Sequence, residues 1–226
     1  VFSVENPLGD FESNVTGTLS MLEICRRKKN AKFIFASSVS VFDKNNTLPL
    51  NELSLIKASS PYGAGKASCE NYCHAYFRSY GLNVNIARMF NVYGPGINKL
   101  FVYDIIKKID DNDKEITIWG DGNQIRDYLF IDDLINGIIL ISRKGVPGED
   151  YNICSGQPIR LIKLVKAIAT VMKINEISII KTKKSYSGDI NAWYGDCSKI
   201  ERLGFEIKTG LLKGLKETIK YINDYE

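Results

Sequence analysis

The order of apolar and polar positions predicts alternating helices and buried strands along the first part of the chain. Apolar residues recur at helical spacing over residues 10–29, and this stretch ends in basic residues, which suit the negative end of a helix. The short apolar run 32–36 indicates a buried parallel strand. A second helix is predicted over 62–80, with Gly81 as its C-cap, and a second strand over 83–89. Two successive strand–helix units indicate a parallel α/β sheet with right-handed crossovers.

The pattern changes after Gly94 and Gly96, where the elements become shorter and more varied. The remaining predicted helices and strands are as follows: helices near 99–109, 132–142, 159–172, 198–203 and 211–225, and strands at 115–118 and 151–153. Such a mixture indicates a smaller α/β part that follows the parallel sheet.

Composition and charge exclude several classes of protein. Hydrophobic residues make up 44% and charged residues 25%, as in ordinary globular proteins, and the net charge is only +4. The basic runs 26–29 and 181–184 are short, and no stretch reaches the ~20 apolar residues of a membrane span, so we expect neither nucleic acid nor membrane as a partner. Five cysteines without a CxxC pair indicate free thiols in a reducing cytoplasm, and no metal site is expected.

A Tyr and a Lys at the start of the 62–80 helix are the first candidates for chemistry. Tyr62 and Lys66 are four residues apart and share a helix face, where an ammonium favours the phenolate and lowers the pKa of a tyrosine. This pair alone is common by chance. Ser38, however, follows the strand 32–36, and Asn91 follows the next strand, so both lie at the sheet edge that faces ligands in parallel α/β folds.

These residues belong to blocks that resemble the extended short-chain dehydrogenase/reductases, in the NAD-dependent nucleotide-sugar epimerase/dehydratase branch that includes UDP-glucose 4-epimerase. The blocks are NVTGT at 14–18, FASS at 35–38, SPYGAGK at 60–66, RMFNVYGPG at 88–96, GDGNQIRDY at 120–128, DD at 132–133, YNI at 151–153 and GD at 188–189. The resemblance implies α/β architecture: a Rossmann-type parallel sheet, here partial, with a smaller C-terminal α/β part for substrate binding. It divides the chain into residues 1–93, the C-terminal portion of the NAD-binding domain, and 94–226, mainly substrate-binding and partly interleaved with the first.

The resemblance also implies roles for individual residues. Tyr62 is the expected general base and acid, Lys66 binds the nicotinamide ribose and lowers the Tyr pKa, and Ser38 bonds the reacting sugar oxygen. The other implied contacts are Ser37 and Phe90 at the cofactor, and Asn91, Arg126 and Asp189 at the substrate, with Arg126 on its diphosphate. The implied cofactor is NAD, with NADP as the alternative. The implied partners are a nucleotide-diphosphate sugar and a second copy in a homodimer, joined through the helices at 10–29 and 62–80.

The residues after Ser38 separate the reactions of this branch. Dehydrating members place an Asp-Glu pair there for elimination, whereas this chain has Val39 and Ser40, which disfavours a 4,6-dehydratase. The expected activity is an NAD-dependent 4-epimerase, in which Tyr62 takes the proton of the sugar 4-hydroxyl while hydride leaves C4 for the cofactor and then returns to the other face. The alternatives are an NAD(P)H-dependent 4-keto-sugar reductase and a non-catalytic fragment that binds nucleotide-sugar or a partner subunit.

Several positions depart from the family pattern. Phe42-Asp43 replaces the usual Tyr-Gly, Gly65 replaces the usual Ser before the catalytic Lys, and Tyr186 replaces a diphosphate-binding Arg. None of the 18 glycines forms the family's Gly-x-x-Gly-x-x-Gly phosphate loop. By this comparison we expect an N-terminally truncated chain that lacks the first βαβ units, roughly 80–90 residues at ~30 per unit.

Some of the polar and aromatic residues also have purely structural interpretations. Arg126 and Asp127 can form an ion pair, and Asp132 and Asp133 are expected to cap the helix that follows them. The tryptophans Trp119 and Trp193 are expected in the core or in a pocket wall.

Overall fold

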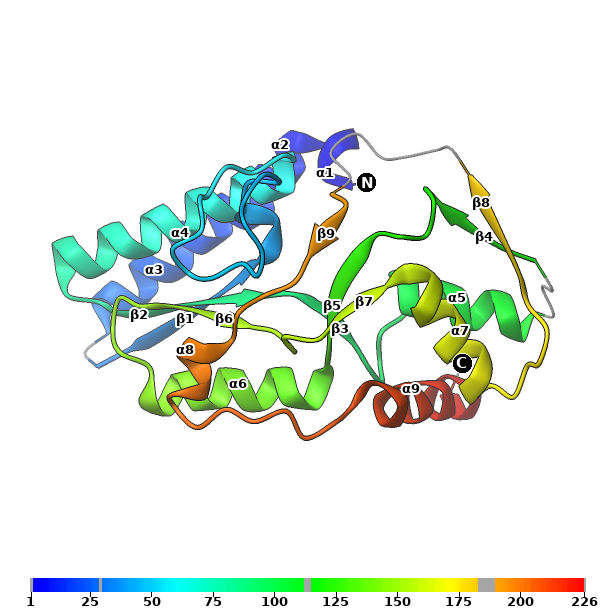
Figure 1. The fold of residues 1–226 in the computed structure, drawn as a ribbon. Coiled ribbons are helices and arrows are strands. Elements are labelled where there is room, and N and C mark those ends of the chain that lie inside the picture. Colours follow the sequence, from blue (N-terminus) through cyan, green and yellow to red (C-terminus); the bar gives the residue numbers. More distant parts are fainter. Residues whose placement is uncertain (1, 29, 112–114, 183–189, 226) are drawn as a thin grey trace. The chain divides into compact units, whose positions relative to one another are not determined.

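The computed structural model in Figure 1 describes residues 2–28, 30–111, 115–182 and 190–225. These residues fall into two compact units, each assembled from three stretches of chain. Unit 1 comprises Val1–Phe90, Asn136–Ile153 and Gly195–Phe205, and unit 2 comprises Asn91–Ile135, Cys154–Tyr194 and Glu206–Glu226. Each unit is described by itself. The functional division into residues 1–93 and 94–226 stays a prediction.

A three-stranded parallel sheet forms the centre of unit 1. Its order is β1 (Lys32–Ser38), β2 (Asn83–Met89) and β6 (Asp150–Ile153), and Ser38 at the end of β1 pairs in register with Met89. The five central residues of β2 are all buried, as expected of a strand covered on both faces. The predicted α/β class with a parallel sheet is therefore confirmed.

Helix α4 (Pro61–Tyr80) carries the chain from β1 to β2, and local signals set both of its ends. The Ser60 hydroxyl accepts the Gly63 N–H at 3.1 Å, and Pro61 occupies the first helical turn, where its missing N–H has no consequence. Gly81 ends the helix in the left-handed region, at φ +65°. The predicted helix and its glycine C-cap are confirmed.

The helix predicted over 10–29 is helical but begins earlier and is interrupted. It consists of α2 (Pro7–Phe11), a π-turn η1 (Glu12–Thr16) and α3 (Gly17–Arg27), and a short α1 (Phe2–Glu5) precedes it. The Asn6 side chain accepts the Gly9 N–H at 3.0 Å, so an Asn-Pro capping signal sets the earlier start.

Two helical layers enclose the sheet of unit 1 (Figure 1). Helices α3 and α4 cover one face, and the part of α6 (Ile131–Lys144) within this unit covers the other with α8 (Ser198–Glu201). Apolar side chains between the sheet and the first pair of helices form a buried core: Val15, Leu22, Phe35, Cys69, Cys73, Leu82, Val84 and Ile86. Cys69 and Cys73 are thus buried in the core.

Unit 2 contains short strands that the sequence pattern mostly did not predict. One sheet joins β3 (Asn91–Tyr93), β5 (Ile125–Phe130), β7 (Pro158–Arg160) and β9 (Ala192–Trp193), and a second pairs β4 (Glu115–Trp119) with β8 (Ser178–Thr182). Of these six strands only β4 was predicted. The others are short or polar, and their pairing partners lie far along the chain, so no periodic signal reveals them.

Helices α5 (Phe101–Asp110), α7 (Leu161–Val171) and α9 (Leu211–Tyr225) pack around the core of unit 2, and α9 has the limits predicted for it. Helix α9 approaches its neighbours closely at Gly214, where an added Cβ would lie 2.4 Å from the Tyr93 hydroxyl. Among the helices described, none combines the length and the apolar character needed to cross a bilayer.

Candidate active site

Ser38 stands at the carboxyl end of β1, where the chain turns into a short 3-10 helix, η2 (Val39–Val41). Its hydroxyl oxygen accepts the Ser40 N–H at 3.2 Å, and the two serine hydroxyls lie 3.2 Å apart within hydrogen-bonding distance. The side chain is only partly buried. The turn therefore holds the Ser38 hydroxyl at the ligand-facing edge of a parallel sheet.

Tyr62 and Lys66 lie on the first two turns of α4 and reach back to this edge. The Lys66 ammonium donates to the Ala36 carbonyl of β1 at 3.1 Å and lies 5.7 Å from the centre of the Tyr62 ring. The Ser38 side chain is near enough to Tyr62 to lower the pKa of its hydroxyl. The structure thus brings the three predicted catalytic residues together within unit 1.

The protonation of this group differs from the expectation. Burial raises the pKa of Tyr62 above its ordinary value, the Ser38 side chain opposes this, and the Asp10 carboxylate adds to it. Burial lowers the pKa of Lys66, with opposing effects of Cys69 and Asp10. The predicted lowering of the Tyr62 pKa by Lys66 is therefore not found, because the shift is upward and Lys66 is not among its causes. Tyr62 holds its proton and is a competent proton donor.

A buried ionic network joins the sheet strands β1, β2 and β6 to α4. Arg88 of β2 donates to both carboxylate oxygens of Glu70 at 2.9 and 2.8 Å, and to Asp150 of β6 at 2.6 Å. Ser37 donates to Glu70 at 2.5 Å. Arg88 and Glu70 are each 1% exposed. Charged hydrogen bonds of this kind are strong in a low dielectric, so the network fixes β1 and β2 against α4.

Glu70 was missed at the sequence level, although its spacing was informative. It follows Lys66 by four residues, so it lies one turn further along the same face of α4. A carboxylate on a face that packs on the sheet requires a cationic partner, and Arg88 is the cation within β2. The network therefore positions the strand that carries Ser38 relative to the helix that carries Tyr62 and Lys66.

The residues predicted at the cofactor have different environments. The Ser37 side chain is fully buried and donates to Glu70, so its hydroxyl belongs to the network. Phe90 is buried, and its N–H donates to the Ile153 carbonyl at 3.3 Å. Lys66 fits a nicotinamide ribose, because an ammonium has three donors and one of them is bound to the Ala36 carbonyl. The cofactor roles of these residues stay predictions.

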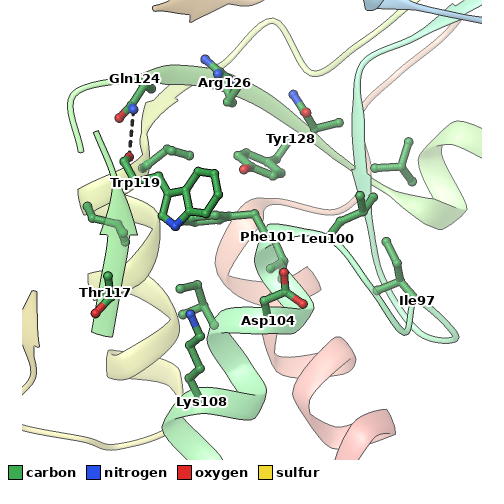
Figure 2. Close-up of a pocket in the computed structure, with 16 residues that line it drawn as sticks. Ile97, Leu100, Phe101, Asp104, Lys108, Thr117, Trp119, Gln124, Arg126 and Tyr128 are labelled. Atoms are coloured by element: carbon green, nitrogen blue, oxygen red, sulfur yellow. Dashed lines mark hydrogen bonds between the residues drawn. The ribbon is translucent and has the colours of Figure 1, made fainter. Parts of the chain in front are cut away.

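Unit 2 contains a pocket of about 380 Å³ whose wall includes two of the predicted substrate residues, Asn91 and Arg126. Figure 2 shows the Trp119 indole, which is 42% exposed, near Arg126 and Tyr128. The lining is mostly apolar and comes from β3, β4, β5 and α7 and from α5 and the loop before it. An apolar pocket with a few polar groups is typical of a small-molecule site. Trp119 is thus a pocket-wall residue, one of its two expected placements.

Strand β5 presents Arg126 and Tyr128 to this pocket because alternate residues of a strand face the same side. Asp127, between them, is fully buried and accepts the N–H and the hydroxyl of Ser155 at 2.7 and 2.6 Å. The Asn91 amide donates to the Asp127 carbonyl at 3.0 Å. Asp127 therefore anchors β5 to the loop after β6. Asp189, and Tyr186 at the position where the family pattern has an Arg, lie outside the described residues.

The pair Asp132 and Asp133 lies in the first turn of α6, and Asp133 does not act as the predicted helix cap. Asp133 is buried and accepts the N–H groups of Lys208 and Thr209 at 3.1 and 3.0 Å. The carboxylate thus holds the segment that leads to α9. A buried carboxylate needs donors wherever the fold supplies them, and here a distant segment supplies them.

Comparison with known proteins identifies the family. The sequence model of the NAD dependent epimerase/dehydratase family matches residues 2–154. A putative UDP-glucose 4-epimerase of Methanocaldococcus jannaschii is 32% identical over 232 residues, which cover 98% of this chain and 73% of that protein. A dTDP-D-glucose 4,6-dehydratase of Dictyostelium discoideum is 36% identical over 174 residues, or 71% of this chain and 39% of that protein.

The fold agrees with the sequence relationship. The crystal structure of UDP-glucose 4-epimerase from Thermotoga maritima with UDP-glucose matches with a TM-score of 0.92 and 30% identity, over 99% of this chain and 73% of that one. The chain thus spans part of the length of each of these relatives, from 39% to 73%. Because the family match covers most of the chain and the fold and blocks agree with it, this protein belongs to the NAD-dependent epimerase/dehydratase family.

Proposed function

We propose that the chain binds a nucleotide-sugar and acts as an NAD-dependent 4-epimerase. The observation that carries the proposal is the convergence of Ser38, Tyr62 and Lys66 at the carboxyl end of β1. Relatives named as UDP-glucose 4-epimerases support this reaction over other uses of the same residues.

In this proposal the Tyr62 hydroxyl transfers the proton at the sugar 4-position. The Ser38 hydroxyl bonds the same sugar oxygen, and the tyrosine takes the proton when the alcohol is oxidised and returns it when the ketone is reduced. Lys66 binds the ribose hydroxyls and stabilises the phenolate through its charge. NAD, when bound, supplies the acceptance and return of hydride at C4.

The lining of the pocket in unit 2 favours a substrate whose bound part is a nucleoside diphosphate. Arg126 offers a guanidinium, which matches the geometry of phosphate oxygens, and the partly exposed Trp119 indole offers a flat surface for a base. Asn91 lies in the same wall, although its amide also bonds the Asp127 carbonyl. Asp189 completes the proposed contacts to substrate.

The residues after Ser38 favour epimerisation over dehydration. Val39 is 4% exposed and apolar, and the Ser40 hydroxyl lies against Ser38. Neither supplies the carboxyl groups that elimination of water from the sugar requires. Under this proposal, the dehydratases among the relatives share the fold of this chain and differ from it in reaction.

The second candidate is an NAD(P)H-dependent 4-keto-sugar reductase. The observation that favours it is the raised pKa of Tyr62, which burial produces, because a protonated tyrosine is the proton donor that ketone reduction needs. The two activities differ in cofactor use, since an epimerase regenerates its cofactor in every cycle and a reductase consumes it.

The test is turnover of UDP-glucose by the purified chain with NAD and no reductant, followed by ¹H NMR of the anomeric protons. We expect UDP-galactose to form without net reduction of NAD. Tyr62→Phe should lower kcat by about 10²–10⁴-fold. Tyr225→Phe is the control, because Tyr225 is 75% exposed at the end of α9, outside the proposed site, and the variant should keep full activity. Turnover only with a 4-keto sugar and stoichiometric NAD(P)H would identify the reductase, and neither activity would contradict both.

We also propose that two copies associate through α3 and α4. These helices carry exposed apolar side chains, among them Met21, Ile24, Tyr72 and Tyr80, and such faces on adjacent helices are typical of interfaces. Light scattering at increasing protein concentration measures the mass directly, and a monomer throughout would contradict the association.

A further inference from the structure

A buried carboxylate lies against α4, the helix that carries the proposed catalytic pair. Asp10 of α2 is only 7% exposed, and its Oδ2 atom lies 3.6 Å from the position that a Cβ on Gly65 would occupy. The Asn14 amide donates to the Asp10 carbonyl at 3.1 Å and to Oδ1 at 3.3 Å, which fixes the orientation of the carboxylate. Asp10 thus lies beside α4 at Gly65, at ordinary contact distance from the point where a side chain would begin.

We propose that Asp10 is a positioning residue, a fixed negative charge that keeps Lys66 in its ammonium form and restrains the release of the proton from Tyr62. The inference rests on the proposed function of the Tyr62–Lys66 pair and assigns that pair a third charged group. Asp10 acts through these two residues.

The arrangement on α4 gives the carboxylate access to both groups. Tyr62, Lys66 and Cys69 follow one another at spacings of four and three residues, so they share a helix face, and Gly65 adjoins it. A charge in a buried position interacts over longer distances than one in water. Asp10 raises the pKa of both residues: it opposes the effect of burial on Lys66 and reinforces it on Tyr62.

The other titratable groups near the pair in the described part of the chain have different environments from Asp10. Cys69 also raises the pKa of Lys66, and burial raises the pKa of its own thiol, so this contribution is common to all the variants compared below. Glu70 lies on the same helix and is bonded to Arg88. Glu5 and Glu12, on the neighbouring α1 and η1, are exposed to solvent, where water and salt screen them.

The absence of a side chain at Gly65 affects the surroundings of the Asp10 carboxylate. A serine at this position would place its Cβ in ordinary contact with the carboxylate and its hydroxyl within reach of the Oδ2 atom. A hydroxyl donor would stabilise the carboxylate locally and weaken its field at Lys66. Gly65→Ser should therefore change the protonation of the pair in the same direction as removal of the charge, and by less.

The first measurement is the titration of Lys66 in the whole chain, by NMR of lysine labelled with ¹³C at Cε. The Lys66 signal is assigned by its absence in Lys66→Arg. Asp10→Asn should lower the Lys66 pKa by about half a unit to one unit. Glu12→Gln, two residues away and exposed, is the matched control and should leave it unchanged.

The second measurement is the pH profile of kcat for epimerisation. Asp10→Asn should move the acidic limb to lower pH by a similar amount, because Tyr62 then releases its proton more readily, so activity on the acidic side rises. Equal titrations and equal profiles for Asp10→Asn, Gly65→Ser and wild type would overturn the inference. A shifted Lys66 titration without turnover in any variant would support the role of Asp10 as a charge while the proposed function fails.

Discussion

The two candidate regions are built on opposite principles. At the edge of the sheet in unit 1, Ser38, Tyr62 and Lys66 lie on β1 and α4. The same two elements are held by an ionic network in which Arg88 and Glu70 are almost completely buried. The pocket of unit 2 has mainly apolar walls, to which several strands, helices and loops contribute, and Arg126 is a cation in its lining. One region is rigid and polar, and the other is an apolar space with a few polar groups.

This difference follows from what each region is proposed to do. Proton transfer needs atoms held within a fraction of an ångström, and interlocked charged hydrogen bonds supply that order. A pocket that binds a base and a diphosphate needs shape and a cation, and apolar walls tolerate small changes of volume. Substitutions should therefore affect unit 1 through stability and kcat, and the pocket through substrate affinity.

The strongest test of the comparison removes the centre of the network. Glu70→Ala leaves Arg88 buried with only part of its partners and leaves the Ser37 hydroxyl without its acceptor. Breaking a buried ion pair from one side typically lowers the free energy of unfolding by about 3–5 kcal/mol. Urea denaturation followed by circular dichroism measures this change.

A surface carboxylate provides the control for this prediction. Glu217 on α9 lies 3.9 Å from Lys213 and is 44% exposed, and a pair of this kind contributes less than about 1 kcal/mol. Glu217→Ala should therefore unfold at nearly the wild-type urea concentration. If Glu70→Ala also unfolds near the wild-type urea concentration, the network does not stabilise the fold as proposed.

The second prediction addresses the pocket and should have a smaller effect on stability and a clear effect on binding. Arg126→Met keeps much of the side-chain length and removes the charge, so the affinity for UDP should fall about 10- to 100-fold while the urea midpoint changes little. Calorimetric titration with UDP measures the affinity.

Arg160 is the matched control for Arg126. It lies on β7, which pairs with β5, and its side chain is exposed and outside the pocket lining. Arg160→Met should bind UDP as the wild type does. Equal losses in the two variants would mean that general charge, rather than the Arg126 position, attracts the diphosphate.

The same contrast explains what could be predicted from the sequence. Helix α4 and the pair on it follow from local signals, namely Ser60 and Pro61 at one end, Gly81 at the other, and a spacing of four residues between Tyr62 and Lys66. These signals act within one element, so tertiary packing does not need to be known. The parallel sheet followed from two successive strand–helix units in the same way.

The parts that could not be predicted depend on residues far apart in the chain. Glu70, Arg88 and Asp150 come from three different elements, and their pairing is a property of the folded sheet. Strand β5 carries polar residues and pairs with strands some 30 residues away on either side or further, so its sequence lacks strand periodicity. Asp10 reaches Gly65 only through the contact of α2 with α4.

The third prediction concerns His74, which adjoins the network at Asp150 and is partly exposed to solvent, so that its interaction should be weaker. His74 lies 3.1 Å from the Asp150 carboxylate and has a quarter of its side chain exposed, so its contribution is smaller than that of Glu70. The neighbouring Asp150 carboxylate raises the pKa of His74, and burial opposes this. A raised pKa in the folded protein means that protonated His74 favours folding.

The sign of the pH dependence follows from this shift. The contribution of His74 is fully present below the pKa of about 6.5 of an unfolded histidine, and it is lost as pH rises through the higher pKa of the folded protein. We expect the wild type to exceed His74→Gln in unfolding free energy at pH 5.5 by less than about 1 kcal/mol, because solvent screens the pair. The difference should shrink by pH 8.5, as urea titrations at the two values would measure. A difference that stays constant with pH would show that His74 acts by packing alone, and the ionic network would then end at Asp150.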